Sequence, residues 1–152
     1  MRKSMRHLML AGVLGAACLA QGAYAADSPS SKEGPDLTRV RAAIKVKNFD
    51  AALTELKTIV VQNPNADAYS LMGYALRKTG DRTQSMTYYR KALETDPTHK
   101  GALEYQGELY VEIGQIDKAK ENLARLGKLC WFGCEEEKDL KEAIEHAPKV
   151  RS

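Results

Sequence analysis

The sequence contains few of the residues from which active sites and cofactor sites are usually built. Among its 152 residues are three histidines, three cysteines and one tryptophan. It has no glycine-rich phosphate-binding loop, and neither Ser70 nor Ser85 has a histidine close to it in the chain. The run Cys-x-x-Cys-His, which attaches haem, is also absent. We therefore expect neither catalysis nor a cofactor or resident metal ion.

The segment Met1–Ala25 has the pattern of a secretory signal peptide. Three basic residues and no acidic one precede an apolar run over Leu8–Ala20, and Ala23-Tyr24-Ala25 matches an A-x-A cleavage site. The run is too short to span a bilayer as a helix. Cys18 would suit a lipid anchor, but Gly15 stands where a lipobox usually has leucine. We predict cleavage after Ala25 and a periplasmic or secreted bacterial protein.

Removal of this segment changes the charge balance. It holds three of the 23 basic residues and none of the 20 acidic ones, so the remainder carries 20 of each sign. No basic excess is left to attract nucleic acid, and no other apolar run is long enough to cross a membrane. Residues 26–34 are rich in serine, proline and charge, which predicts a disordered leader.

The stretch Ala66–Pro97 predicts two antiparallel helices joined by a tight turn. Thr79-Gly80-Asp81 separates them, because glycine tolerates positive φ and aspartate can cap the next helix. Asp96-Pro97 ends the second helix, since proline disfavours helix in the residue before it. Apolar or small residues form one face of each helix. They are Tyr69, Met72, Gly73 and Leu76, and then Ser85, Tyr88, Tyr89, Ala92 and Leu93.

The same pattern recurs along the chain. Two glycine pairs, Gly73/Gly107 and Gly80/Gly114, have the same spacing and so define one repeat length. At these residues the chain resembles the tetratricopeptide repeat family, whose pattern is W-x2-L-G-x2-Y, then A-x3-F, then P. The sequence meets it as Tyr69-x2-Met72-Gly73-x2-Leu76, Ser85-x3-Tyr89 and Pro97.

The resemblance implies an all-α fold, a right-handed superhelical solenoid of about three helical hairpins plus a C-terminal capping helix. We expect the repeats at about residues 35–64, 66–97 and 99–129, the capping helix over 135–147 and a tail over 148–152. The first hairpin should open with a short helix, because Asp36 and Arg39 occupy positions that are usually apolar.

The resemblance also implies where a ligand would bind, since the first helices of successive hairpins line a concave groove in this family. Carried over by position, the groove residues are Arg41, Lys45, Tyr74, Arg77, Lys78, Glu104, Glu108 and Glu112, with Asp67 and Ser70 nearer the rim. Such a groove, basic on two helices and acidic on the third, would orient a peptide, with Tyr74 as an aromatic anchor. Alternatively, Arg77 and Lys78 pair with Glu104 and Glu108, and the charges only keep the surface soluble.

Two cysteines remain after the predicted cleavage, Cys130 and Cys134. An even number in an exported protein predicts a disulfide. We expect a small loop in which Trp131 and Phe132 close the end of the core. A reversible thiol pair, or a metal site completed by His146, is the alternative.

Two functions remain open. The first is a non-enzymatic periplasmic interaction module, a scaffold or adaptor that binds a protein or peptide segment in the groove, with self-association possible. The second is a thiol-redox or metal-handling accessory protein centred on Cys130/Cys134. His99 lies beside a helix-ending proline and is expected to be a solvated turn residue. The segment Leu129–Glu136 also resembles that of small exported bacterial repeat proteins, which implies fold and compartment but no biochemical role.

Overall fold

The computed structural model describes residues 34–148, and in this range every regular element is an α-helix. The predicted signal peptide, all but the last residue of the leader and all but the first residue of the tail lie outside the described residues. The helices are α1 (Thr38–Lys45), α2 (Phe49–Gln62), α3 (Ala66–Lys78), α4 (Arg82–Thr95), α5 (Lys100–Glu112), α6 (Ile116–Leu129) and α7 (Glu135–Glu145). No helix between residues 34 and 148 is both long and apolar enough to cross a bilayer.

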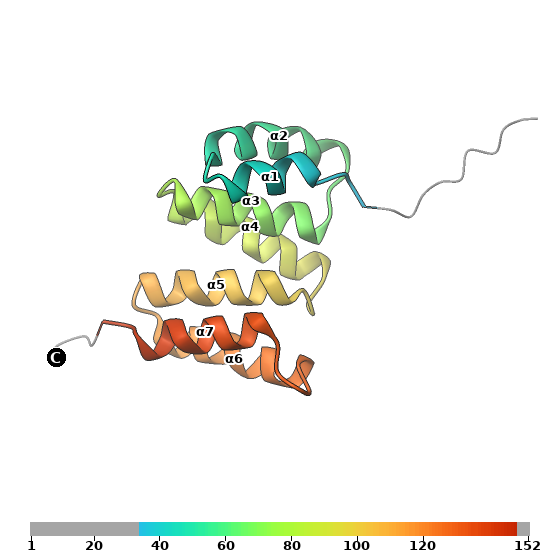
Figure 1. Ribbon diagram of the computed structural model, residues 1–152. Helices are drawn as coiled ribbons and strands as arrows, with labels where there is room; N and C mark the ends of the chain where they lie inside the picture. Colours follow the sequence, from blue (N-terminus) through green and yellow to red (C-terminus); the bar gives the residue numbers. More distant parts are fainter. Residues whose placement is uncertain (1–33, 149–152) are drawn as a thin grey trace, which may run out of the picture. The chain divides into compact units, whose positions relative to one another are not determined.

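The helices form three hairpins and a final single helix. Each helix packs against the next one in the chain, and α5 also packs against α3 and α7. The first helices of the hairpins and α7 therefore succeed one another from top to bottom in Figure 1. This arrangement confirms the predicted helical repeat solenoid with its capping helix, and α1 is short, as expected, with eight residues.

The turn inside each hairpin has the same backbone conformation. Gly80 (φ 94°) and Gly114 (φ 75°) occupy the left-handed region at matching positions. In the first hairpin the same place is taken by Lys47, with φ 59°. A non-glycine residue is disfavoured in this region, because its Cβ crowds the following carbonyl oxygen. The three turns therefore share a positive φ at this position, although the first has a lysine where the others have glycine.

Gly73 and Gly107 both mark close contacts, but with different helices. A Cβ on Gly73 would lie 2.6 Å from the ring of Tyr89, in the second helix of its own hairpin. A Cβ on Gly107 would lie 2.5 Å from Leu140, which belongs to α7. The two glycines thus occupy equivalent positions on α3 and α5, but the helices that pack against them differ.

The core has two apolar clusters. One includes Val40, Leu56 and Met72 and lies in the first two hairpins. The other contains Leu103, Leu126 and Leu140, all without exposed surface, in the third hairpin and α7. Leu140 thus joins the C-terminal cluster to the capping helix.

The prediction that Trp131 and Phe132 close the core is wrong. Their exposures are 89% and 102%. The loop Cys130–Cys134 buries its first residue and is tied at both ends, so the residues between form an outward tip. Leu140 instead completes the C-terminal apolar cluster.

Candidate functional site

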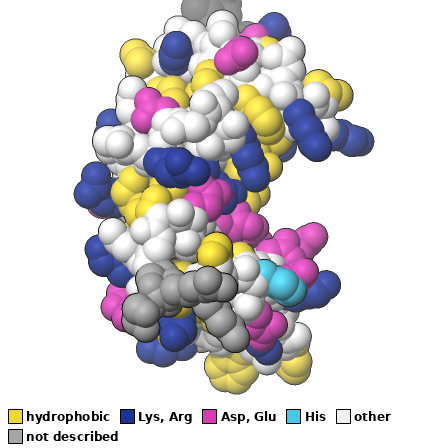
Figure 2. Space-filling view, turned by 90° about the vertical axis from the view of Figure 1, so that its left-hand side faces the viewer, with side chains coloured by type: hydrophobic (Ala, Val, Ile, Leu, Met, Phe, Trp, Pro, Cys, Tyr) yellow, Lys and Arg dark blue, Asp and Glu magenta, His cyan; other side chains and the backbone are white. Residues whose placement is uncertain are grey.

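A hollow runs along the face formed by α1, α3, α5 and α7. Figure 2 shows it opening at the right of the view, with Lys and Arg side chains on one wall and Asp and Glu side chains on the other. Within it lies a pocket of about 200 Å³ to which all four helices contribute. Its polar lining comes from Arg41, Asp67, Ser70, His99, Glu104 and Glu136. We call this cavity the groove pocket.

Arg77 is buried in an ion-pair bridge between α3 and α5. Its side chain is only 3% exposed, and its guanidinium donates to Glu108 and, over 2.9 Å, to Glu112 Oε1. The planar guanidinium can serve two carboxylates at once, which an ammonium group does less well. Arg77 is therefore not free to meet a ligand. The pairing alternative describes this residue, although its second partner is Glu112 rather than Glu104.

Tyr74 belongs to an aromatic row in the wall of the groove. Its ring centroid lies 4.8 Å from that of Tyr105 and 6.2 Å from that of Phe49. The Lys78 ammonium lies 5.2 Å from the Tyr74 ring centroid, within the range of a cation–π contact. The predicted aromatic anchor is thus half-buried by neighbours from three hairpins. Lys78 remains exposed, although it contacts Tyr74 rather than the glutamates.

The remaining predicted cations lie on α1. Arg41 and Lys45 are both exposed. Arg41 lines the groove pocket, and its Nη2 atom lies 3.8 Å from Asp67 Oδ1. Lys45 lies outside the pocket. An exposed pair at this distance contributes little to stability. These two side chains, with Lys78, are the predicted groove cations that remain accessible.

The prediction that His99 is a solvated turn residue is wrong. Its side chain is 17% exposed and caps α5, with Nδ1 accepting the Ala102 N–H over 3.0 Å. Since Nδ1 is the acceptor, Nε2 carries the proton and donates it to Asp67 Oδ1, also over 3.0 Å. The sequence signal that could have found this role is position, because His99 stands one repeat length after Asn65, the N-cap of α3.

Glu104 differs in its contacts from Glu108 and Glu112, the other two glutamates on this face of α5. The residue is 9% exposed and lines the groove pocket, while Glu108 and Glu112 bind Arg77. Burial, and after it the charges of Glu108, Asp139 and Glu136, raise the pKa of Glu104 to about 8. In neutral water this carboxyl group is therefore mostly protonated. The three acids lie on one helical face, as predicted, but Glu108 and Glu112 form ion pairs whereas Glu104 lines a pocket.

The comparisons with known proteins agree with this architecture. Two family models, each described as "Tetratricopeptide repeat", match residues 66–99 and 88–121. These residues form the second hairpin and most of the third. The chain contains tetratricopeptide repeats.

Two relatives show how far this similarity extends. The tetratricopeptide repeat chain is 31% identical over 97 residues to "Cellulose synthase 2 operon protein C" of Komagataeibacter xylinus, covering 62% of this chain and 7% of the relative. It is 31% identical over 80 residues to "BBSome complex member BBS4" of Bos taurus, covering 53% of this chain and 15% of the relative. The chain therefore spans only a small part of either relative.

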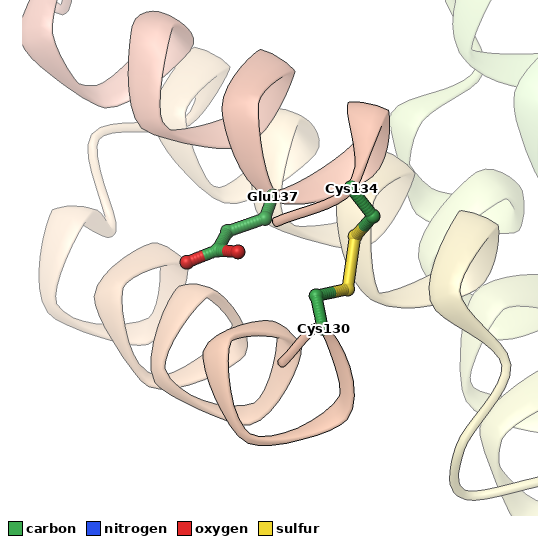
Figure 3. A group of neighbouring side chains, drawn as sticks. All are labelled: Cys130, Cys134 and Glu137. Atoms are coloured by element: carbon green, nitrogen blue, oxygen red, sulfur yellow. A yellow bond between two sulfur atoms is a disulfide. The ribbon is translucent and has the colours of Figure 1, made fainter. Parts of the chain in front are cut away.

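Outside the groove, Cys130 and Cys134 of the tetratricopeptide repeat protein form the predicted disulfide. It joins the end of α6 to the start of α7, as Figure 3 shows. The carboxylate of Glu137 lies near both sulfur atoms, with the three potential ligand atoms within 4.8 Å of one another. Among the described residues the third group in this cluster is Glu137, and the expected His146 is not part of it. Three ligands of this kind fall short of the four that a structural zinc site requires.

Proposed function

We propose that the protein is a periplasmic scaffold or adaptor that binds a segment of a partner protein in the groove formed by α1, α3, α5 and α7. Tetratricopeptide repeats are generally non-enzymatic and bind protein partners. The observation that carries the proposal is the groove pocket, a polar hollow to which four helices contribute. The relative from Bos taurus is named as a member of a complex, which accords with a role in assembly.

The periplasmic part of the proposal rests on two features. The segment Met1–Ala25 carries the signal-peptide pattern, and Cys130 and Cys134 form a disulfide. Disulfides persist in oxidising compartments and are rare in the cytosol. Fractionation of cells of the source organism, with thiol labelling of the recovered protein, tests this part separately from binding.

The accessible cations of the groove offer the sharpest test of binding. Arg41 and Lys45 are exposed on α1, so their reversal in an R41E/K45E variant leaves the buried Arg77 bridge intact. Reversal of Arg77 itself would disturb the fold and would not be informative. A matched control is K57E/K120E, which reverses two exposed lysines on the second helices α2 and α6.

The experiment begins with a photo-crosslinking residue at position 78, at the exposed end of α3, in the source organism. The captured partner is identified and then titrated against the purified variants. The groove has cations on α1 and acids on α5 and α7, so a complementary segment carries both signs. We therefore expect R41E/K45E to bind at least about tenfold more weakly and K57E/K120E to bind normally. Equal binding by both variants would refute binding of the partner in the groove.

A second function is favoured by one observation, the proximity of Glu137 to Cys130 and Cys134. It is a thiol-redox or metal-handling role of the reduced pair. Thiol titration of protein recovered from its native compartment distinguishes it from a structural bridge. A pair that is oxidised and resists mild reductant supports a purely structural bridge, whereas reversible reduction or co-purified metal supports the second function.

A further inference from the structure

The groove pocket is lined by an acidic group, Glu104, to which the described residues give no hydrogen-bond or ion-pair partner. Glu104 is 9% exposed, and its carboxyl group forms neither a hydrogen bond nor an ion pair with any residue between 34 and 148. The oxygens of Glu104 are not among the side-chain atoms sealed from solvent without a partner, so in the empty pocket water can reach them. An occupant that donates hydrogen bonds to Glu104 would take the place of that water.

The cations near Glu104 lie beside other acids. Asp67 accepts a hydrogen bond from His99, and Arg41 lies 3.8 Å from the same carboxylate oxygen. Glu108 of α5 is bound by Arg77 of α3. Arg77 is thus held by Glu108, and the exposed Arg41 lies beside Asp67, so among residues 34–148 neither arginine pairs with Glu104.

The charges around Glu104 determine which occupant fits. Glu108 of α5 and both Glu136 and Asp139 of α7 act on it as like charges, and Arg77 of α3 opposes them only in part. An anion would meet repulsion from three carboxylates, whereas a cation would meet attraction from all of them. Tyr105 also lines the cavity and supplies an aromatic ring, which favours cations as well.

The size of the cavity favours one side chain over a whole small molecule. Its volume is about 200 Å³, below the range of about 300–1,000 Å³ that is usual for small-molecule pockets. We propose that the groove pocket receives the cationic side chain of a lysine or arginine in the bound protein segment, whose nitrogen donates to the carboxylate of Glu104. This inference rests on the proposed binding of a segment in the groove and specifies one residue of that segment.

Binding of the cation is coupled to the release of a proton. Burial and the neighbouring acids raise the pKa of Glu104 to about 8, so the empty pocket holds mostly the neutral acid at pH 7. The ligand cation requires the ionised form, and the apparent affinity scales with the fraction of protein in that form. Between pH 6.5 and pH 8.5 that fraction rises about 25-fold for a pKa of about 8. A lysine ligand keeps its own charge over this interval, since its unperturbed pKa is about 10.4.

The probe is Nα-acetyl-lysine amide, and its matched control is Nα-acetyl-norleucine amide, which has the same stem without the ammonium group. Both are titrated into the full isotope-labelled chain while amide shifts of Glu104, Tyr105 and Glu136 are followed by NMR. We expect saturable shifts with the lysine compound and at least tenfold lower affinity for the norleucine compound. The lysine compound should bind about 25-fold more tightly at pH 8.5 than at pH 6.5.

Glu104→Gln removes the ionisable group and keeps its shape, and Glu121→Gln makes the same change at an exposed position on α6. We expect E104Q to lose at least tenfold in affinity and E121Q to retain it, with equal helical content by circular dichroism. Equal binding of both probes, or full affinity in E104Q, would overturn the inference.

The two proposals can fail separately. If the partner captured by crosslinking binds E104Q and the unmodified chain equally, segment binding stands and the cation pocket is refuted. If the lysine compound binds through Glu104 but R41E/K45E binds the partner normally, the pocket stands and the proposed groove function is refuted.

Discussion

Leu140 of α7 lies directly over the Cα atom of Gly107 in α5. A Cβ atom at position 107 would lie 2.5 Å from Leu140 Cδ2 and 2.6 Å from its Cδ1, distances that real Cβ atoms do not show. The absence of a side chain on Gly107 therefore sets how closely the capping helix approaches the third hairpin. Leu140 has no exposed surface and completes the C-terminal apolar cluster.

We expect Gly107→Ala to destabilise the protein by about 1–3 kcal/mol, the usual cost of overpacking a core. The loss should appear even though alanine is the better helix former by about 1 kcal/mol. Gly127→Ala on α6 is the matched control, because its new methyl group would meet only the flexible end of Glu137 at 3.4 Å. Urea unfolding followed by circular dichroism measures both. Equal stabilisation by the two substitutions would contradict the close contact.

Lys47→Gly should stabilise the first hairpin. Lys47 has φ 59°, the conformation that glycine adopts at the matching positions in the other two turns. Glycine removes the strain of the left-handed region but adds entropy to the unfolded chain, so the net gain should be below about 1 kcal/mol. Lys45→Gly, two residues earlier in α1, should instead lose about 0.5–1 kcal/mol. Thermal melts of both variants check the opposite signs.

Gln115→Asp should stabilise α6. Asn48 and Asp81 cap the second helices of the first two hairpins through their side chains, whereas Gln115 makes no such hydrogen bond. A capping carboxylate satisfies a free N–H and interacts favourably with the helix dipole, for a gain of about 1 kcal/mol. Asp81→Ala should lose a similar amount. The free energy of unfolding in urea tests both, and an unchanged value for Q115D would argue against the equivalence of the three turns.

Arg77→Met should destabilise the protein by about 2 kcal/mol. Removing one member of a fully buried pair costs about 3–5 kcal/mol. Here the loss is smaller, because Glu108 and Glu112 are 25% and 36% exposed and can be rehydrated. Arg82→Met removes an arginine that is 57% exposed and reaches the same Glu112 at 3.4 Å. It should change stability by less than about 1 kcal/mol. A comparable loss of stability in the two variants would show that the buried ion pairs of Arg77 contribute no more than the exposed pair of Arg82.

Glu104→Gln should make the protein less sensitive to rising pH. Burial raises the pKa of Glu104 from its ordinary value of 4.5 to about 8. The contribution of this group to stability is fully present below about pH 4.5 and is lost as the pH rises through about 8. We expect E104Q and the unmodified chain to be similarly stable near pH 4.5. At pH 8.5 the variant should be more stable by at least about 1.4 kcal/mol, the value of one pKa unit. Parallel pH–stability curves would contradict the raised pKa.

The sequence was sufficient to predict the features that depend on local backbone chemistry. Gly80 and Gly114 mark turns because few other residues adopt positive φ, and Asp81 caps α4 because its side chain reaches the first turn of that helix. Repetition of these signals indicated the hairpins and their approximate limits. The helical spacing of Glu104, Glu108 and Glu112 likewise placed them on one face.

The sequence was not sufficient where the outcome depends on which helices meet. Arg77 is buried because two carboxylates of α5 face it, and no pattern within α3 contains that information. Glu104 stands on the same stripe as those carboxylates but faces a pocket instead. Trp131 and Phe132 have core-like side chains, yet the path of a short bridged loop leaves both in solvent.

Under the proposed function, the docking of α7 against α5 would also limit the length of the bound segment. The capping helix takes the place that the first helix of another hairpin would occupy, so the proposed binding surface would consist of four helices, α1, α3, α5 and α7. With neighbouring axes about 9 Å apart, the span from first to last is roughly 27 Å. A strand-like chain advances about 3.3 Å per residue, so the recognised motif would comprise about eight residues.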